Sequence, residues 1–297
     1  MVYPVGPPSV VAGVDGSLSS RSAACVAAGY SVRHRLPLRL VCGYLPASYS
    51  WPALGLAGYV AVGSRQAGDE ASAALATVAE ELRAAYPGLS SVTIEPCVGR
   101  AAAVLIAASR LAAVTVVGSR GSRTVGGMML CSVAGRVAAR AHSTVIVARA
   151  ESGDVDHRVG GGGPVLVGVD WSDHAAGAVR FAVDEAAARA ASLVVAHAHR
   201  VPATGWRRCR HDMLDALELL SQLSDPCRVT HPGLVVHTQL IPATDPARAM
   251  VDVAGWAALT VVGGRGDGGY RGLRLGSVAR ALVRDAATPV AIVRLAR

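Results

Sequence analysis

The 297-residue chain contains two copies of one sequence pattern, one in each half. VAGVDGS, which contains Asp15, returns as LVGVDWS with Asp170, 155 positions later. GSRGSRTVGGMMLCS, which begins at Gly118, returns as GGRGDGGYRGLRLGS from Gly263, 145 positions later. A repeat that spans most of the chain predicts two copies of one structural unit. The offset falls by about ten positions, which we interpret as a longer loop between the second strand and the second helix of the first half.

Two domains of about 150 residues are also what a chain of this length favours. We expect a first domain over residues 1–149 and a second over residues 164–297. Between them, residues 150–163 read AESGDVDHRVGGGG, a composition typical of a flexible linker. An apolar content of 52% supplies enough hydrophobic side chains for two cores.

Neither a membrane segment nor a secretory signal is expected. The longest uncharged stretch, residues 40–64, is interrupted by Pro46, Pro52 and a polar run, so we interpret it as a strand end followed by a long apolar loop. The chain does not open with a basic segment followed by an apolar run, which favours a cytoplasmic protein. Its six cysteines include no CxxC pair, so we expect reduced thiols.

Each half is predicted to alternate strands and helices. In the second half, continuous apolar runs predict strands, and Ala-rich or amphipathic segments predict helices. The predicted strands are 165–169, 193–198, 234–241, 259–262 and 290–294, and the predicted helices 175–191, 212–223, 246–256 and 277–286. Such alternation implies a parallel sheet with helices on both faces. We therefore predict an α/β fold of two tandem flavodoxin-like or Rossmann-like domains, with ligands beyond the carboxyl ends of the strands.

The basic side chains exclude several functions. All 29 are arginine, and without lysine the chain can form neither a Walker P-loop nor a Schiff base. The net charge of +8 suits an anionic partner. Because the arginines are scattered and not interleaved with aromatic residues, we expect no nucleic-acid binding.

The glycine-rich stretch from Gly263 follows an apolar run and precedes a predicted helix. Bare backbone N–H groups in such a loop, and the positive end of the helix dipole, are suited to hold phosphate. VGVDWS after the first strand, and VVGGRGDGGYRGLRLGS with its Gly-x2-Gly-x9-Gly-Ser spacing, resemble the nucleotide-binding members of the universal stress protein family. The resemblance covers nearly the whole chain as two tandem copies. It implies a five-stranded parallel sheet of order 3-2-1-4-5 in each domain.

The same resemblance implies an ATP site between the first and fourth strands of each half. Asp15 and Asp170 would accept from a ribose hydroxyl or help hold Mg²⁺, the strand-two position would contact adenine, and the glycine loop would cradle the phosphates. The implied residues of the second half are Gly168, Asp170, Ala198, Gly263, Gly266, Gly276 and Ser277. Those of the first half are Gly13, Asp15, Gly43, Gly118, Gly121 and Ser132.

Cys131 departs from this pattern, because the second half has Gly276 at the matching position. If the position needs only an ordinary helical backbone, the first site binds ATP; if it needs bare glycine, its affinity falls. Simpler interpretations also stay open. Asp15 and Asp170 could be helix caps, and the glycines could serve only a tight turn.

Three functions are compatible with these patterns. The first is an ATP-binding stress-response or growth-regulating module that acts on a protein partner and pairs with a second copy as a dimer. The second is a weak ATPase or self-phosphorylating enzyme, for which the sequence offers no positioned general base; we expect at most slow ATP hydrolysis. The third is a nucleotide-free dimeric scaffold. His197 and His199 share one face of a strand, but no third metal ligand is evident, so we interpret them as ordinary strand-end histidines.

Overall fold

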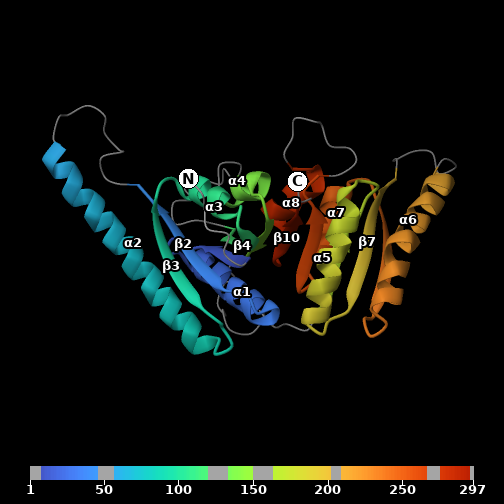
Figure 1. Ribbon diagram of the computed structural model, residues 1–297. Coiled ribbons are helices and arrows are strands. Elements are labelled where there is room, and N and C mark those ends of the chain that lie inside the picture. Colours follow the sequence, from blue (N-terminus) through green and yellow to red (C-terminus); the bar gives the residue numbers. More distant parts are fainter. Residues whose placement is uncertain are drawn as a thin grey trace. The chain divides into compact units, whose positions relative to one another are not determined.

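The computed structural model describes residues 8–45, 57–119, 133–149, 163–201, 209–265 and 275–294. The chain divides into two compact units, Met1–Ser152 and Gly153–Arg297. Of the predicted linker, only Gly163 is described. Within the described residues each unit contains a sheet of five parallel strands flanked by helices (Figure 1).

In the first unit the strands lie in the order β3-β2-β1-β4-β5, and neighbouring strands are parallel. Its elements are β1 (Ser9–Gly13), α1 (Leu18–His34), β2 (Leu38–Tyr44), α2 (Ala57–Ala85), β3 (Val92–Val98), α3 (Ala101–Ala108), β4 (Ala112–Gly118), α4 (Val133–Arg140) and β5 (Thr144–Ala148). Gly13 at the end of β1 pairs in register with Val41 of β2.

The second unit repeats this topology, with the order β8-β7-β6-β9-β10 and parallel neighbours. Its elements are β6 (Val165–Gly168), α5 (His174–Ala188), β7 (Leu193–Arg200), α6 (Cys209–Thr230), β8 (Val236–Ala243), α7 (Pro246–Ala254), β9 (Leu259–Gly263), α8 (Ser277–Asp285) and β10 (Val290–Val293). Gly168 at the end of β6 pairs with Ala196 of β7. Both units therefore confirm the predicted α/β fold and the 3-2-1-4-5 order.

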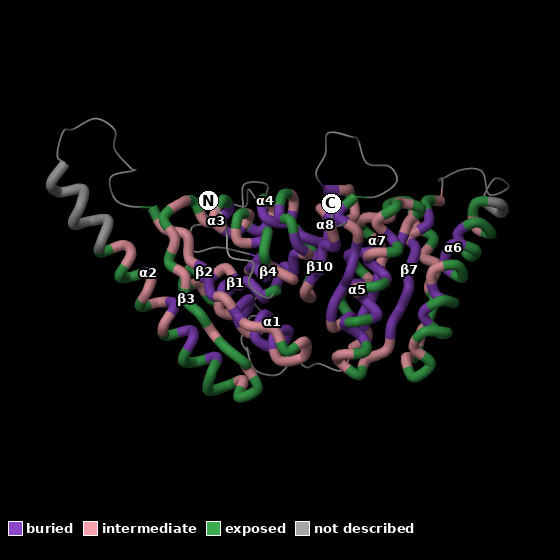
Figure 2. The backbone as a smooth tube through the Cα atoms, in the orientation of Figure 1, coloured by how far each residue is buried: buried purple, intermediate pink, exposed green. Residues whose placement is uncertain are grey.

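The central strands form the cores of the two sheets. β1, β6 and β9 are buried at every residue but the last. β4 is buried over residues 114–117, and Figure 2 shows its buried stretch beside β1. Their Val and Leu side chains pack on both faces, as expected of strands covered by helices on both sides. The edge strand β3 is instead half-exposed. Loops at the carboxyl ends of the central strands are thus held by the most rigid part of each unit.

The helices of the second unit pack on both faces of its sheet. α7 and α8 contact each other on one face, where Met250 of α7 packs against Leu166 and Ala196. α5 and α6 contact each other and cover β6, β7 and β9. Because side chains alternate along a strand, His197 projects to the face opposite Ala196 and Ala198.

Helices α2 and α6 are longer than the sequence predicted. α2 begins at Ala57, inside the stretch 40–64 that we interpreted as a strand end and loop. α2 has 29 residues and α6 has 22, so most of the extra residues of the first half extend a helix, and the interpretation as a longer loop was wrong. α6 runs through Pro226 to Thr230, although a proline removes one helical hydrogen bond and normally ends the pattern.

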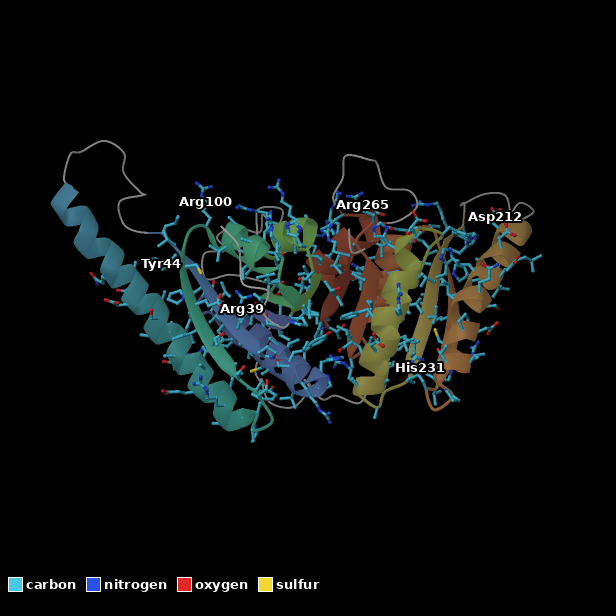
Figure 3. All side chains as sticks on the ribbon, viewed as in Figure 1. Arg39, Tyr44, Arg100, Asp212, His231 and Arg265 are labelled. Carbon is cyan, nitrogen blue, oxygen red and sulfur yellow. The ribbon has the colours of Figure 1, made fainter. Side chains whose placement is uncertain are left out.

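An ion pair joins the edge strand of the first unit to its neighbour. Arg39 of β2, labelled in Figure 3, donates through Nε to Glu95 Oε1 (2.6 Å) and through Nη2 to Glu95 Oε2 (2.7 Å). A two-bond arginine–carboxylate contact fixes orientation as well as distance. The two residues are diagonal neighbours, because Arg39 is in register with Thr93 and Glu95 with Val41. Their contact lies before the carboxyl ends of the strands, and neither residue lines a cavity at those ends.

Candidate functional site

The carboxyl ends of β6 and β9 meet where the winding direction of the second sheet reverses. β6 and β9 are neighbours, with Gly168 in register with Val262. The chain leaves β6 toward α5 and leaves β9 toward α8, which cover different faces of the sheet. In open α/β sheets such a reversal leaves a crevice beyond the strand ends, where ligands bind.

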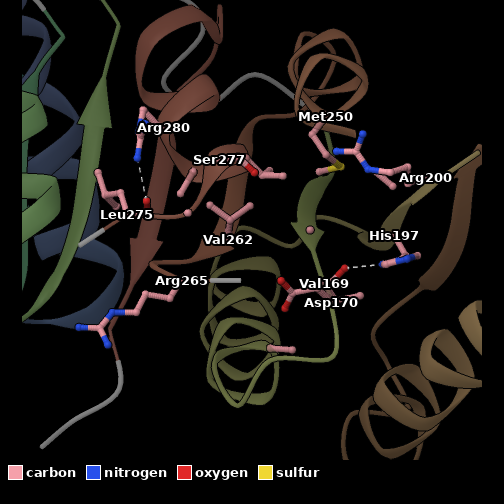
Figure 4. Close-up of a pocket in the computed structure, with 17 residues that line it drawn as sticks. Val169, Asp170, His197, Arg200, Met250, Val262, Arg265, Leu275, Ser277 and Arg280 are labelled. Carbon is pink, nitrogen blue, oxygen red and sulfur yellow. Dashed lines mark hydrogen bonds between the residues drawn. The ribbon is translucent and has the colours of Figure 1, made fainter. Parts of the chain in front are cut away.

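A cavity of about 380 Å³ occupies this crevice (Figure 4). This volume lies within the range of small-molecule sites. It brings together all the predicted site residues of the second half that the structure describes: Gly168, Asp170, Ala198, Gly263, Gly276 and Ser277. Gly266 lies outside the described residues.

Asp170 holds a tight turn at the cavity. Its Oδ1 accepts from the backbone N–H of Ser172 (3.1 Å) and from the Ser172 hydroxyl (2.5 Å). Asp15 makes the same two bonds with Ser17 (3.1 and 2.6 Å). Neither aspartate is the N-cap of the following helix, because Ser17 and Asp173 are the N-cap residues. Each carboxylate is thus fixed at the end of the first strand of its unit.

The first turn of α8 faces the cavity with backbone donors. The N–H of Gly276 donates to the Gly264 carbonyl (3.0 Å), and the first helical bond runs from the Arg280 N–H to Gly276. The N–H groups of Ser277, Val278 and Ala279, which line the cavity, make no bond to another described residue. Free donors at the positive end of a helix dipole form a ready anion site.

The backbone of Gly276 bears on the question raised by Cys131. Gly276 has φ −66° and ψ 167°. Any residue can adopt this backbone conformation where there is space for its side chain. Positive φ is therefore no reason for glycine here. Cys131 itself lies outside the described residues, as do Gly121 and Ser132.

At two positions of the cavity, the structural reason for glycine differs from the one we expected. A Cβ on Gly168 would lie 2.8 Å from Met250 Cε, and one on Gly263 would lie 2.7 Å from His174 Cβ. The space beside each Cα is therefore filled by helices of the same unit, and not by the cavity. These glycines let α7 and α5 approach the strand ends closely.

Charged side chains of the cavity are mainly cationic. Among the described residues that line it, Arg200, Arg265 and Arg280 are joined by a single carboxylate, that of Asp170. Arg280 donates through Nη2 to the Leu275 carbonyl (3.3 Å). In Figure 4 the side chain of Arg265 points away from Asp170. The excess of positive charge suits an anionic ligand.

The matching cavity of the first unit is smaller, about 60 Å³. It brings together the predicted residues Gly13, Asp15, Gly43 and Gly118. Asp15 is the one charged residue among the described residues that line it. A Cβ on Gly43 would lie 2.6 Å from the Cα of Ala101, so the start of α3 lies directly against β2. The second unit has Ala198 at the position of Gly43, which is incompatible with so close an approach.

Two histidines near the second cavity have shifted pKa values. His197 donates through Nδ1 to the Val169 carbonyl (2.8 Å), and burial lowers its pKa although this bond opposes the shift. At His174, burial lowers the pKa and Arg265 adds to the effect. His197 lies 6.1 Å from His199 between ring centroids. Over the described part of the chain no group of three metal-binding side chains occurs, and no helix is long and apolar enough to cross a membrane.

Sequence reasoning did not single out Arg200 or Met250 as lining residues, although both face the cavity. Arg200 lies two residues beyond Ala198, so strand alternation could have placed it on the same face. Met250 is found only through the packing of α7, which the repeat alone does not reveal.

Comparisons with known proteins agree over both units. The sequence profile of the universal stress protein family matches residues 8–149 and 163–294. A universal stress protein of Mycobacterium tuberculosis is 30% identical over 290 residues, and one of Mycolicibacterium smegmatis is 29% identical over 294 residues; each match covers 96% of both chains. The crystal structure of a universal stress protein from Archaeoglobus fulgidus matches with a TM-score of 0.70 at 18% identity, covering 96% of this chain and 98% of the other.

Proposed function

The chain belongs to the universal stress protein family, and from this premise we propose that it is an ATP-binding stress-response module whose second unit holds the nucleotide. One observation carries the proposal: a cavity at the switch point joins Asp170, backbone N–H groups of the first turn of α8 that bond to no described residue, and described lining charges that are mainly arginine. Each of these features suits one part of a nucleotide.

The phosphate groups are best matched by the first turn of α8. Ser277, Val278 and Ala279 offer their N–H groups there, and Arg280 adds positive charge one turn later. Backbone donors and a helix dipole bind phosphate without a lysine. This agrees with a chain in which every basic side chain is arginine.

The ribose is best matched by Asp170. Its Oδ1 already accepts from Ser172, but a carboxylate can accept about four hydrogen bonds over its two oxygens. A ribose hydroxyl could therefore donate to it. The backbone of Ala198 at the neighbouring strand end would contact adenine. Mg²⁺ would be held by the phosphates together with Asp170, since Mg²⁺ keeps several waters and needs few protein ligands.

The first unit is proposed to bind ATP more weakly or not at all. Its cavity is the smaller of the two, and among its described lining residues Asp15 is the only charge. The contact between Gly43 and Ala101 narrows the end where adenine would lie. This proposal does not depend on whether Cys131 itself lowers the affinity of the first site, a question that the sequence left open.

Binding of ATP would act by shifting the association of the protein with a partner, or with a second copy, toward the nucleotide-bound form. In that way the protein would regulate growth or the stress response without itself catalysing a reaction. A weak ATPase or self-phosphorylating enzyme and a nucleotide-free dimeric scaffold are the alternatives.

The test compares the two aspartates. Nucleotide is extracted from the purified protein and identified by chromatography, and ATP is then titrated calorimetrically into wild type, Asp170→Asn and Asp15→Asn. We expect bound ATP with about one tight site per chain, at least about tenfold weaker binding in Asp170→Asn, and little change in Asp15→Asn. Wild type that retains no nucleotide and gives no heat with ATP would overturn the proposal.

The same samples separate the alternatives. Slow phosphate release that Asp170→Asn abolishes would favour the enzyme. A stable dimer that neither retains nor binds nucleotide would favour the scaffold.

A further inference from the structure

Arg200 is a cation that the proposed ATP contacts leave unused. It is the last residue of β7 and lines the cavity. In Figure 4 its side chain extends toward Met250. Its Nη1 donates to the Thr244 carbonyl (3.3 Å), and no described carboxylate lies within salt-bridge distance of it. A guanidinium carries five N–H donors, so most of them remain for a ligand.

Arg200 lies at the opposite end of the cavity from the α8 helix terminus. The strand order puts β6 between β7 and β9, so two strand spacings of about 4.8 Å separate the chain ends that carry Arg200 and Gly263. Figure 4 likewise draws Arg200 apart from Arg280 and Arg265. The cavity therefore offers one anion site at α8 and a second positive group across β6.

We propose that the second unit takes a nucleotide that carries a phosphate on its ribose in addition to its 5′-phosphate, and that Arg200 binds this second phosphate. The inference rests on the proposed function, because it requires the 5′-phosphate to lie at the first turn of α8. The nucleoside then extends along the cavity toward β7: one ribose hydroxyl donates to Asp170, and the phosphate on the neighbouring ribose oxygen reaches the Arg200 guanidinium. Arginine matches phosphate oxygens with two parallel hydrogen bonds.

The first unit lacks this arrangement. The position of Arg200 is occupied there by Leu45, an apolar residue that is 42% exposed. Leu45 does not line the smaller cavity. The second phosphate site is therefore a property of the second unit alone, and Arg200→Leu converts it to the side chain of the first.

The probes are adenosine 5′-monophosphate, adenosine 3′,5′-bisphosphate, adenosine 2′,5′-bisphosphate and ATP, titrated calorimetrically into the full chain. In wild type we expect one of the two bisphosphates to bind at least about tenfold more tightly than the monophosphate. Arg200→Leu should abolish this difference in affinity between bisphosphate and monophosphate while leaving the affinity for the monophosphate nearly unchanged. Arg248→Leu is the matched control: it removes an arginine that is ion-paired with Asp252 on α7 and does not line the cavity.

Each of the other outcomes would overturn either this inference alone or the inference together with the proposed function. If ATP binds but neither bisphosphate exceeds the monophosphate, the second phosphate site is wrong and the proposed function stands. If Arg200→Leu weakens all probes by the same factor, its guanidinium contacts the base and the inference fails. If none of the four nucleotides binds to folded wild type, the proposed function and the inference fall together.

Discussion

The imidazole of His197 packs edge-on against the indole of Trp171, with ring centroids 4.7 Å apart and ring planes at 80°. The same imidazole donates to the Val169 carbonyl (2.8 Å). Val169 and Trp171 are the two sequence neighbours of Asp170, so one side chain of β7 holds the chain on both sides of that carboxylate. The first unit has Cys42 at this position, 155 residues earlier.

His197→Phe is therefore expected to disturb Asp170 through its neighbours. Phenylalanine keeps a ring against Trp171 but leaves the Val169 carbonyl without its donor, a loss of about 1 kcal/mol of folding stability. ATP affinity should fall several-fold as the turn loosens. Denaturant unfolding and calorimetry measure the two effects. Cys42→Ala is the control in the first unit; if His197→Phe loses stability but keeps full ATP affinity, His197 only supports the fold.

Stability should also depend on pH through His197. Burial lowers its folded-state pKa below the usual 6.5; His199 adds to this, while the bond to Val169 and the charge of Asp170 oppose it. As the pH falls, the unfolded chain then takes up a proton before the folded chain does. The contribution of neutral His197 to the free energy of unfolding is therefore present above pH 6.5. It is lost as the pH falls from 6.5 to the folded-state pKa. We expect Tm to fall between about pH 7.5 and about pH 5.5, less steeply in His197→Phe.

His174 changes the size of this effect and not its sign. Burial and Arg265 lower its pKa as well, so His197→Phe should remove only part of the slope. The exposed His237 on β8 provides a control in His237→Gln. Equal slopes of Tm against pH in His197→Phe, His237→Gln and wild type would show that His197 does not titrate with unfolding.

Gly43 and Ala198 give a matched test of why the two cavities differ. Gly43→Ala would bring a Cβ to 2.6 Å from the Cα of Ala101. Because this Cα is a backbone atom, it cannot rotate away as the end of a flexible side chain could. We expect a loss of about 1–3 kcal/mol of stability from such overpacking. Ala198→Gly should cost less than about 1 kcal/mol, the usual penalty of glycine in a strand.

Thermal unfolding followed by circular dichroism measures these changes. Gly233→Ala is the control, because no atom lies within 4 Å of the Cβ it would add. A Gly43→Ala variant as stable as wild type would mean that α3 can move away from β2, and the smaller cavity would then be no barrier to a ligand.

Much of this architecture could be predicted from the sequence because the repeat and the buried strands leave periodic signals. The strand predicted at 259–262 and the helix predicted from Pro246 agree with β9 and α7 within two residues at each end. The helix that passes Pro226 could not be predicted, since local rules end a helix there and only packing against the sheet extends it.

The place of the cavity could be predicted from the sequence, but the packing around it could not. Asp170 and Ser277 were placed at one cavity because parallel strands bring their carboxyl ends together. The reason for Gly168 and Gly263 could not be read from the chain, because Met250 and His174 fill their Cβ positions from distant segments. Whether a glycine admits a ligand or a helix is a property of packing and not of spacing.

The two units also carry different residue pairs at two matching positions near the end of the first helix. Glu185 of α5 and Arg189, the C-cap residue of this helix, form a buried ion pair, with Nη2 to Oε2 at 2.9 Å and side-chain exposures of 1% and 13%. At the same positions of α1, Tyr30 and His34 stack with centroids 4.2 Å apart. A buried carboxylate needs its cation, whereas two stacked rings carry little desolvation cost.

Arg189→Ala is therefore expected to destabilise the second unit strongly, by about 3–5 kcal/mol, because the Glu185 charge stays buried without its arginine. Arg248→Ala, which breaks an exposed i,i+4 pair with Asp252, should change stability by less than about 0.5 kcal/mol. Denaturant unfolding of both variants at neutral pH makes the comparison. The double variant Glu185→Leu/Arg189→Leu should recover most of the loss, since apolar side chains can replace a buried ion pair. Equal, small effects of the two arginine variants would mean that water reaches Glu185, and the pair would then resemble a surface salt bridge.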